Sequence, residues 1–224
     1  MPVIACPALR VMVVDDELLL RSGVSEILGV APDINVVAAC GGAEAVETVR
    51  STAPDVVLLD IRMPDVDGLT VLRRLRSLPN PPYVAMLTTF DTDDYLGESL
   101  RLGASGFLLK TIHPLELIKA VRALGTGAGC LTAPMRRRLQ EEGTRIGRAA
   151  GRREMAALSA RERQVLVLAM EGLTYAAIGA ELHLSPATIK DHMASLVSKL
   201  GVENRTQAVV KAALTGLTRT EDAQ

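Results

Sequence analysis

Short apolar runs alternate with longer amphipathic stretches along the first 125 residues. Five of the runs are too apolar to have one face in water, which is typical of parallel strands that are covered on both faces. The predicted strands are Arg10–Val14, Ile34–Cys40, Asp55–Asp60, Tyr83–Thr88 and Gly106–Lys110, and the predicted helices span about 17–29, 42–52, 67–77, 92–103 and 114–125. This alternation predicts an α/β fold with a doubly wound, five-stranded parallel sheet.

From Leu158 onward the pattern is helical, and the helices begin at recognisable capping residues. The stretch "SARE", which ends at Glu162, has the spacing of a capping box and precedes an apolar run. The next two helices are predicted to begin after Thr174 and Ser185, because threonine and serine cap helices and a proline follows the serine. A last helix is predicted over about Arg205–Leu217. The chain therefore ends in a small all-α domain of four helices.

The third of these helices has two distinct faces. Apolar side chains on one face are Ile189, Met193, Leu196, Val197 and Leu200, and the other face holds Ala187, Lys190, Asp191, Ala194 and Ser198. A polar, small and smooth face is what a helix needs to enter the major groove of DNA. Two short helices joined by a tight turn, with this face on the second, predict a helix-turn-helix motif. From periodicity alone, a plain helical bundle is an equal alternative.

Residues 126–157 are rich in Gly, Ala and Arg and have no sustained periodicity. We interpret them as a linker, in which Met135–Glu142 could form a short helix. The basic side chains could contact phosphates or the acidic first domain, but a solvated tether is the favoured interpretation. The predicted domains are thus 1–125, 126–157 (the linker) and 158–224.

Composition and charge narrow the class of protein. With 48% hydrophobic residues, the 224-residue chain can bury a core. It has no apolar run of about 18 residues and no basic start followed by an apolar stretch, so neither a membrane span nor a signal peptide is expected. A cytoplasmic location and no membrane partner are therefore expected. Cys6, Cys40 and Cys130 are widely spaced, which argues against a disulfide framework and a zinc site.

The net charge of −1 conceals an uneven distribution of charged residues. Residues 1–125 hold 11 basic and 16 acidic residues, residues 126–157 hold 7 and 3, and residues 158–224 hold 7 and 7. An acidic first part and a basic joint indicate two units with different partners. The neutral third part weakens the electrostatic case for nucleic acid.

Acidic, hydroxyl and basic residues lie at the carboxyl ends of several predicted strands. Asp15 and Asp16 follow the first strand, Asp60 ends the third, Thr88 the fourth and Lys110 the fifth. Ligands of a doubly wound sheet bind at this edge, and a hard cation such as Mg²⁺ would relieve the repulsion between the acids. Each residue alone is more often an ordinary surface or capping residue, but their joint placement predicts a site at which a nucleophilic aspartate accepts a phosphoryl group. Strand alternation favours Thr88 over its neighbour Thr89 as the residue that faces this pocket.

The stretches "VVDDE", "LLDIRMPDVDG", "MLTTF" and "GASGFLLKTIHPLEL" occur in the order found in response-regulator receiver domains, which residues 9–125 resemble. The resemblance implies a flavodoxin-like fold. The roles that it implies are Asp15 and Asp16 as the acidic metal pair, Asp60 as phosphoacceptor, the Arg62 carbonyl as a further metal ligand, Thr88 as the switch hydroxyl, Lys110 as the phosphate partner and Phe107 as the aromatic switch. Phe107 could equally serve only as packing for the last strand. Gly68 matches a tight loop in which glycine permits a positive φ.

The stretch from Leu158 to Ala212 is similar along its length to LuxR-type DNA-binding domains, so nearly the whole chain resembles NarL/FixJ-type transcriptional response regulators. The DNA-binding residues that this implies are Thr188, Lys190, Asp191, His192, Ala194, Ser195 and Lys199. Asp191 and Ala194 stand where relatives often carry an apolar and a basic residue. Asp191 could accept a hydrogen bond from cytosine, and Ala194 could contact a thymine methyl group.

The resemblance implies a phosphorylation-controlled transcriptional regulator of a two-component system. Its expected partners are a sensor histidine kinase, promoter DNA and a second copy of the chain, with RNA polymerase as a further candidate; Mg²⁺ is the expected cofactor. Apart from phosphotransfer to its own aspartate, no enzymatic activity is expected. Two alternatives stay open: a phosphate-independent regulator controlled by a ligand or by dimerisation, and a phospho-switched protein whose helical domain binds another protein.

Overall fold

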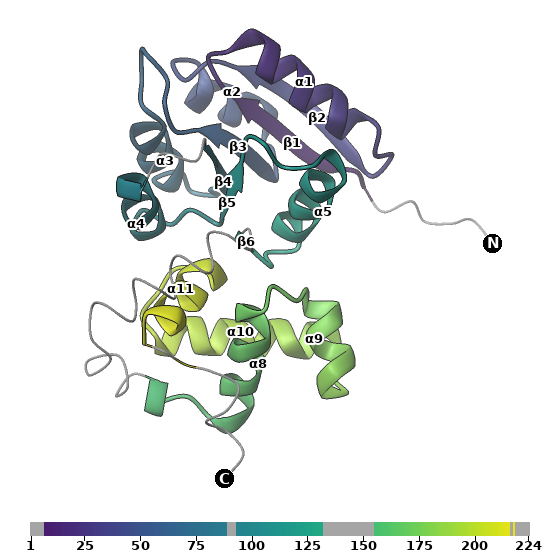
Figure 1. The fold of residues 1–224 in the computed structure, drawn as a ribbon, viewed down its shortest axis with the longest axis vertical. Coiled ribbons are helices and arrows are strands. Elements are labelled where there is room, and N and C mark those ends of the chain that lie inside the picture. Colours follow the sequence, from purple (N-terminus) through teal and green to yellow (C-terminus); the bar gives the residue numbers. More distant parts are fainter. Residues whose placement is uncertain (1–6, 89–92, 132–154, 216, 218–224) are drawn as a thin grey trace, which may run out of the picture. The chain divides into compact units, whose positions relative to one another are not determined.

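The computed structural model describes residues 7–88, 93–131, 155–215 and 217. The chain divides into two compact units, 1–127 and 128–224. Figure 1 shows that the first consists of a sheet with helices and the second of helices. Thr89 and the short helix predicted at Met135–Glu142 lie outside the described residues. The domain boundaries predicted from the sequence stay predictions.

The sheet has the strand order β2-β1-β3-β4-β5-β6, and its strands β1 to β5 lie in the first unit. Its strands are β1 (Leu9–Val14), β2 (Ile34–Cys40), β3 (Val56–Asp60), β4 (Tyr83–Thr88), β5 (Gly106–Leu109) and β6 (Cys130–Leu131). The pairings among β1 to β5 are all parallel. The predicted five-stranded, doubly wound sheet is therefore confirmed. The two-residue strand β6 was not predicted, since two residues carry no periodicity.

Helices cover both faces of this sheet (Figure 1). They are α1 (Leu18–Gly29), α2 (Ala45–Thr52), α3 (Gly68–Arg76), α4 (Asp93–Arg101) and α5 (Pro114–Gly125). Helix α1 packs beside α5, while α3 packs beside both α2 and α4, which gives two helical layers. In the described parts of the chain, no helix combines the length and the apolar character that a bilayer-crossing segment requires.

The central strands owe their position to continuous apolar sequence. All side chains of Val11–Val14 and Val56–Leu59 have 0% exposure. Burial of one such side chain stabilises the fold by roughly 1.5–3 kcal/mol, so β1 and β3 are rigidly held between the two helical layers. The residues that follow these two strands are therefore fixed in space by the core beneath them.

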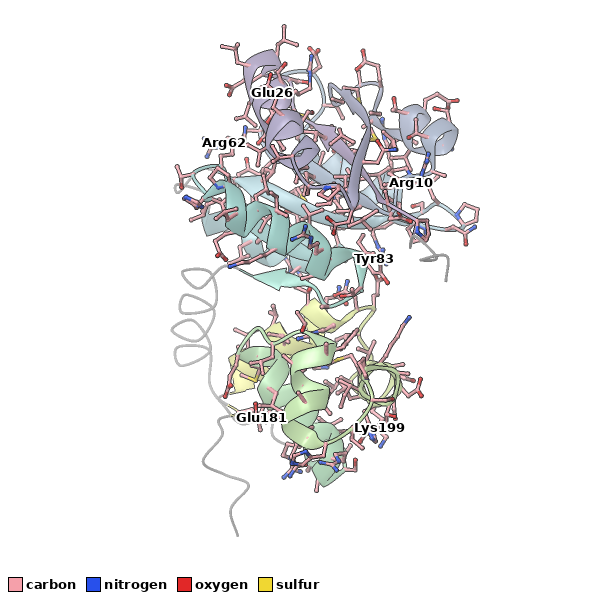
Figure 2. All side chains as sticks on the ribbon, turned by 90° about the vertical axis from the view of Figure 1, so that its right-hand side faces the viewer. Arg10, Glu26, Arg62, Tyr83, Glu181 and Lys199 are labelled. Carbon is pink, nitrogen blue, oxygen red and sulfur yellow. The ribbon has the colours of Figure 1, made fainter. Side chains whose placement is uncertain are left out.

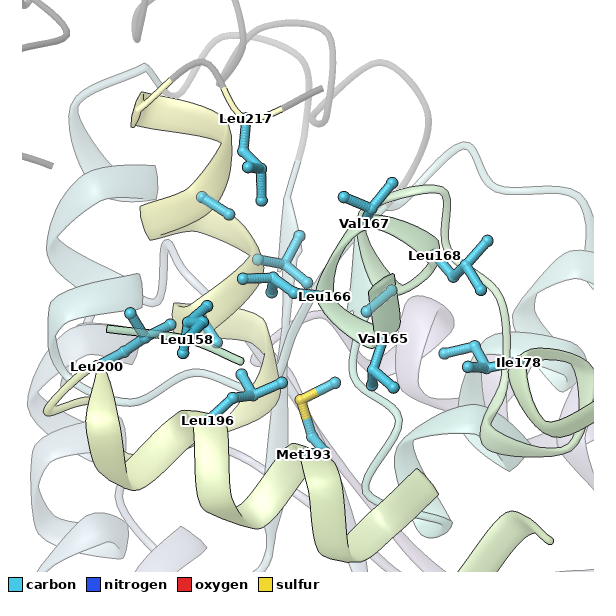
Figure 3. Packing of buried hydrophobic residues seen from close by; sticks show 14 of the residues in the cluster. Leu158, Val165, Leu166, Val167, Leu168, Ile178, Met193, Leu196, Leu200 and Leu217 are labelled. Carbon is cyan, nitrogen blue, oxygen red and sulfur yellow. The ribbon is translucent and has the colours of Figure 1, made fainter. Parts of the chain in front are cut away.

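The second unit is a helical domain of α8 (Ala160–Met170), α9 (Tyr175–Leu182), α10 (Pro186–Lys199) and α11 (Arg205–Thr215). The predicted caps are confirmed, because Ser159 and Glu162 form a capping box and the side chains of Thr174 and Ser185 accept the expected backbone N–H groups. Met193 and Leu196 point from α10 toward Val165 and Leu166 of α8 in a buried apolar cluster (Figure 3).

The turn after α9 packs so closely on that helix that one helical position, Gly179, must be glycine. A Cβ atom on Gly179 would lie 2.5 Å from the Leu184 carbonyl oxygen. Leu184 N donates to the Gly179 carbonyl at 2.8 Å, and His183 ends α9 with a φ of 56°. Helix α9 thus ends in a sharp reversal that brings α10 against it, which is the geometry of the predicted helix-turn-helix motif.

Candidate functional site

The predicted acidic residues meet at the carboxyl edge of the sheet. Asp15 follows β1 and Asp60 ends β3, and these neighbouring strands flank the point where the strand order reverses. Both residues are buried, with 0% and 4% exposure. Lys110, which follows β5, lies between them, with its Nζ 2.9 Å from Asp15 Oδ2 and 3.0 Å from Asp60 Oδ1. The structure therefore brings three of the predicted site residues into one ion triad.

The charges of the triad depend on one another. Burial raises the pKa of the Asp60 carboxyl, and the Asp15 charge adds to this rise, while hydrogen bonds from Lys110 and from the Arg62 backbone oppose it. Burial alone would lower the pKa of Lys110, but the hydrogen bonds and charges of Asp15 and Asp60 outweigh it and raise that pKa. The ammonium thus stays protonated between two crowded acids, a state typical of functional sites.

Asp16 contributes a third carboxylate to this edge. Its Oδ1 accepts a hydrogen bond from Gly42 N at 3.0 Å. Its Oδ2 is buried and has no hydrogen-bond partner among the described residues. A buried carboxylate oxygen without a partner is costly, so the site has capacity for a further cation or donor.

These residues fit Mg²⁺ by their chemistry. In the part of the chain that the structure describes, no three His, Cys, Asp or Glu side chains already form a metal-binding group. Lys110 instead compensates the charges of Asp15 and Asp60. Carboxylate and carbonyl oxygens are nevertheless the ligands that Mg²⁺ prefers, and the unpartnered Asp16 oxygen is such a ligand.

The predicted switch residues lie on the neighbouring strands β4 and β5. Thr88 ends β4 and is 1% exposed, and Lys110 N donates to its carbonyl oxygen at 2.8 Å. Phe107 pairs with Met86 in the neighbouring strand and is fully buried. The Arg62 side chain is exposed, and its guanidinium carbon lies 5.9 Å from the centre of the Tyr95 ring (Figure 2 labels Arg62).

The predicted DNA-binding residues lie along α10. Lys190, Asp191 and Ala194 are exposed, whereas Thr188 and His192 are half-buried. The Thr188 hydroxyl lies 2.8 Å from Ser185 Oγ at the start of the helix. Ile189, Met193, Leu196 and Leu200 are buried, which confirms the predicted apolar face.

Two further predicted DNA contacts, Ser195 and Lys199, have a partner within the domain. Ser195 Oγ and Lys199 Nζ each donate to a carboxylate oxygen of Glu162 at 2.7 Å. Sequence reasoning assigned Glu162 only to the capping box. The spacing of Ser195 and Lys199, one helical turn apart, is a signal that two side chains can share a partner.

Comparison with known proteins identifies the family of both domains. Residues 11–122 match the response regulator receiver domain, and residues 156–212 match the bacterial regulatory proteins of the luxR family. The chain is 39% identical over 210 residues to the "Probable transcriptional regulatory protein NarL" of Mycobacterium tuberculosis, covering 91% of this chain and 93% of the relative. This chain belongs to the NarL/FixJ-type response regulators. It is accordingly a phosphorylation-controlled, DNA-binding transcriptional regulator of a two-component system.

Other relatives of this response regulator cover both of its units. The transcriptional regulatory protein UhpA of Escherichia coli is 39% identical over 197 residues, which cover 88% of this chain and 93% of UhpA. The crystal structure of the response regulator ChrA, from a heme-sensing two-component system, is 35% identical with a TM-score of 0.52, covering 95% of this chain and all of ChrA.

Gly68 has a different role in the receiver domain from the one predicted. Its φ is not positive. Instead, a Cβ atom on this residue would lie 2.1 Å from the Asp60 carbonyl oxygen and 2.9 Å from Ile61 Cα. Glycine is needed here because α3 begins against the backbone of Asp60, and the sequence pattern could not distinguish close approach from a positive φ.

We expect Gly68→Ala to destabilise the receiver domain by about 2 kcal/mol, because the methyl group overlaps backbone that the core holds in place. Chemical denaturation of the full chain measures this. Gly97→Ala is the matched control, since a Cβ atom there meets nothing within 4 Å. Equal stability of the two variants would contradict the close approach.

Proposed function

We propose that Asp60 is the phosphoacceptor of this response regulator. The observation that supports it most directly is the ion triad, in which Lys110 Nζ lies 3.0 Å from Asp60 Oδ1 and 2.9 Å from Asp15 Oδ2. An Asp60 carboxylate oxygen attacks the phosphorus of a donor and forms an O–P bond. The bond from phosphorus to the donor's leaving group breaks, and the leaving group departs with the electron pair. Lys110 neutralises charge on the transferring oxygens, so the protein supplies mainly positioning and electrostatic stabilisation.

The proposed ligands of Mg²⁺ are Asp15, Asp16, Asp60 and the backbone carbonyl of Arg62. When bound, the ion supplies positive charge that polarises and orients phosphoryl oxygens. Asp16 Oδ2 has no hydrogen-bond partner among the described residues, so this oxygen is available as a ligand. Asp15 holds Lys110 by its ion pair at 2.9 Å, so the ammonium stays beside Asp60 for the transfer.

Thr88 and Phe107 are proposed to transmit the phosphorylated state. The Thr88 hydroxyl donates a hydrogen bond to the new phosphate, which moves β4. This movement displaces Phe107 on the adjacent strand β5. A shift from 1:99 to 99:1 between two conformers requires roughly 5.5 kcal/mol of preference for the active one. Hydrogen bonds to charged groups contribute about 1.5–3 kcal/mol each, so Lys110, Thr88 and a backbone N–H can together supply it.

The proposed DNA contacts are made by α10. Lys190, Asp191 and Ala194 are the exposed residues that face the major groove, where the Lys190 ammonium binds a phosphate, and Thr188 and His192 lie beside the DNA backbone. Asp191 accepts from cytosine and Ala194 packs on a thymine methyl group. Helix α11 pairs two copies of the domain on an inverted repeat.

We expect Lys190→Met to weaken DNA binding by roughly tenfold and to reduce the slope of log affinity against log salt concentration by about 0.9, because one ammonium no longer displaces a counterion. Fluorescence anisotropy over a salt series gives both values. An unchanged slope together with unchanged affinity would exclude Lys190 from the interface.

The proposed partners follow from this mechanism. A sensor histidine kinase donates the phosphoryl group, a second copy of the chain completes binding to promoter DNA, and RNA polymerase is a further candidate. Promoter DNA is a cytoplasmic partner in bacteria, so the function requires that compartment. Beyond transfer to its own aspartate, we propose no enzymatic activity.

Selection of bound genomic DNA fragments, with and without beryllofluoride as a phosphate mimic, tests the proposed output. We expect an enriched inverted repeat that is recovered more strongly with the mimic. Absence of any enriched sequence would favour a helical domain that binds protein. Equal enrichment in both samples would favour a phosphate-independent regulator.

A further inference from the structure

Glu162 is a buried carboxylate that joins two helices. It is 3% exposed. One carboxylate oxygen accepts from Ser159 N at 2.8 Å and from Lys199 Nζ at 2.7 Å, and the other accepts from Ser195 Oγ at 2.7 Å. The start of α8 is therefore tied to the C-terminal half of α10 by polar contacts to a single residue.

The carboxylate of Glu162 is charged at neutral pH. Burial raises its pKa, but the hydrogen bonds from Lys199, Ser195 and Ser159 outweigh burial and lower the pKa to about 2. A capping box needs only the contacts within α8, which contribute about 1 kcal/mol. The two contacts to α10 exceed what capping requires.

The contacts restrict how α10 can turn about its axis. Ser195 and Lys199 lie one turn apart on the same side of the helix, so both reach the same carboxylate. Successive residues of an α-helix project about 100° apart around its axis, so their relative directions are fixed. A rotation of α10 about this axis would therefore turn Lys190, Asp191 and Ala194 together, away from their present direction. The apolar contacts of Met193 and Leu196 alone are non-directional, whereas the hydrogen bonds to Glu162 fix one orientation.

We propose that Glu162 is a positioning residue for DNA recognition, which holds α10 in the rotation that presents Lys190, Asp191 and Ala194, and that Ser195 and Lys199 serve this contact instead of binding DNA. The proposal rests on the proposed DNA-binding function of α10. It narrows the predicted contact set to Thr188, Lys190, Asp191, His192 and Ala194.

Lys199 best distinguishes a residue that binds DNA from one that only holds Glu162. Its side chain is 42% exposed on the surface of the second unit (Figure 2), so either role is open to it. A lysine that contacts a phosphate contributes about 0.9 to the salt slope of binding, and its removal weakens binding to every sequence alike. A lysine that only holds Glu162 contributes nothing to the slope, and its removal weakens specific binding more than non-specific binding.

The test compares Glu162→Gln, Ser195→Ala and Lys199→Met in the full chain activated with beryllofluoride, using a selected fragment and a scrambled duplex. We expect each variant to keep the wild-type salt slope and to lose roughly tenfold in the ratio of specific to non-specific affinity, the size of one base contact. In the Glu162→Gln background, Lys199→Met should add little further loss, since the two residues act as a pair. Lys190→Met is the matched control, for which the slope falls.

Three results would overturn the proposal. The first is a salt slope that falls as much for Lys199→Met as for Lys190→Met, in an assay in which the wild-type protein binds the selected fragment. The second is a Glu162→Gln variant that is less stable but keeps the wild-type ratio of specific to non-specific affinity, which is the result of a purely structural role. The third is that the wild-type protein binds no fragment selectively. This result would overturn the proposed function as well, whereas the first two would overturn only the role of Glu162.

Discussion

Asp60→Asn is expected to abolish phosphate uptake by the full chain. Asp60 ends β3 beside Lys110, and its carboxylate oxygen is the proposed nucleophile. An asparagine amide keeps the shape of the side chain but cannot form a stable acyl phosphate. Intact-protein mass spectrometry, after incubation with Mg²⁺ and a small acyl phosphate, should show one added phosphoryl group in the wild type and none in the variant.

The matched control is Asp65→Asn, which removes an exposed aspartate from the loop after β3. This variant should be phosphorylated like the wild type, because Asp65 lies outside the ion triad. Phosphorylation of Asp60→Asn at the wild-type rate would place the acceptor elsewhere in the chain. Loss of phosphorylation in both variants would indicate that the loop, and not the Asp60 nucleophile, limits the reaction.

Lys110→Met is expected to lower the free energy of unfolding by about 3 kcal/mol in metal-free buffer. The substitution leaves Asp15 and Asp60 buried without their shared cation, and breaking a buried ion pair on one side costs about 3–5 kcal/mol. Mg²⁺ should stabilise the variant more than the wild type, because it replaces the missing positive charge. Phosphate uptake should fall as well, since the transferring oxygens lose a cationic partner.

Lys119→Met tests whether any lysine would give this result. Lys119 forms a surface ion pair with Glu116 on α5, and both side chains are more than half exposed. Such pairs contribute about 0–1 kcal/mol, so this variant should remain close to the wild type. If chemical denaturation shows Lys110→Met to be as stable as Lys119→Met, the ion triad does not hold the site together.

Much of the fold follows from local sequence. Tyr83–Thr88 was predicted with its observed bounds, because a continuous apolar run between polar loops leaves little freedom in where a buried strand begins and ends. The predicted β5 ended one residue later than the observed strand, which stops at Leu109. The residues of the candidate site could also be found, since parallel strands bring their carboxyl ends to one edge.

The contacts within the sites could not be predicted in the same way. A strand-end pattern locates Lys110 at an edge but does not say that its side chain lies between Asp15 and Asp60, because that depends on side-chain rotamers. The capping box at Glu162 is visible as a local spacing, whereas its bond to Ser195 joins residues far apart in the chain.

The central claim is that a phosphoryl group on Asp60 controls DNA binding by α10. Its most direct test is the affinity of the wild type and of Asp60→Asn for a selected promoter fragment, measured with and without Mg²⁺ and a small acyl phosphate. We predict that the phosphodonor increases the affinity of the wild type at least roughly tenfold, as a population shift of a few kcal/mol requires, and leaves Asp60→Asn unchanged. An equal increase in both proteins, or no increase in a wild type shown by mass to be phosphorylated, would contradict it.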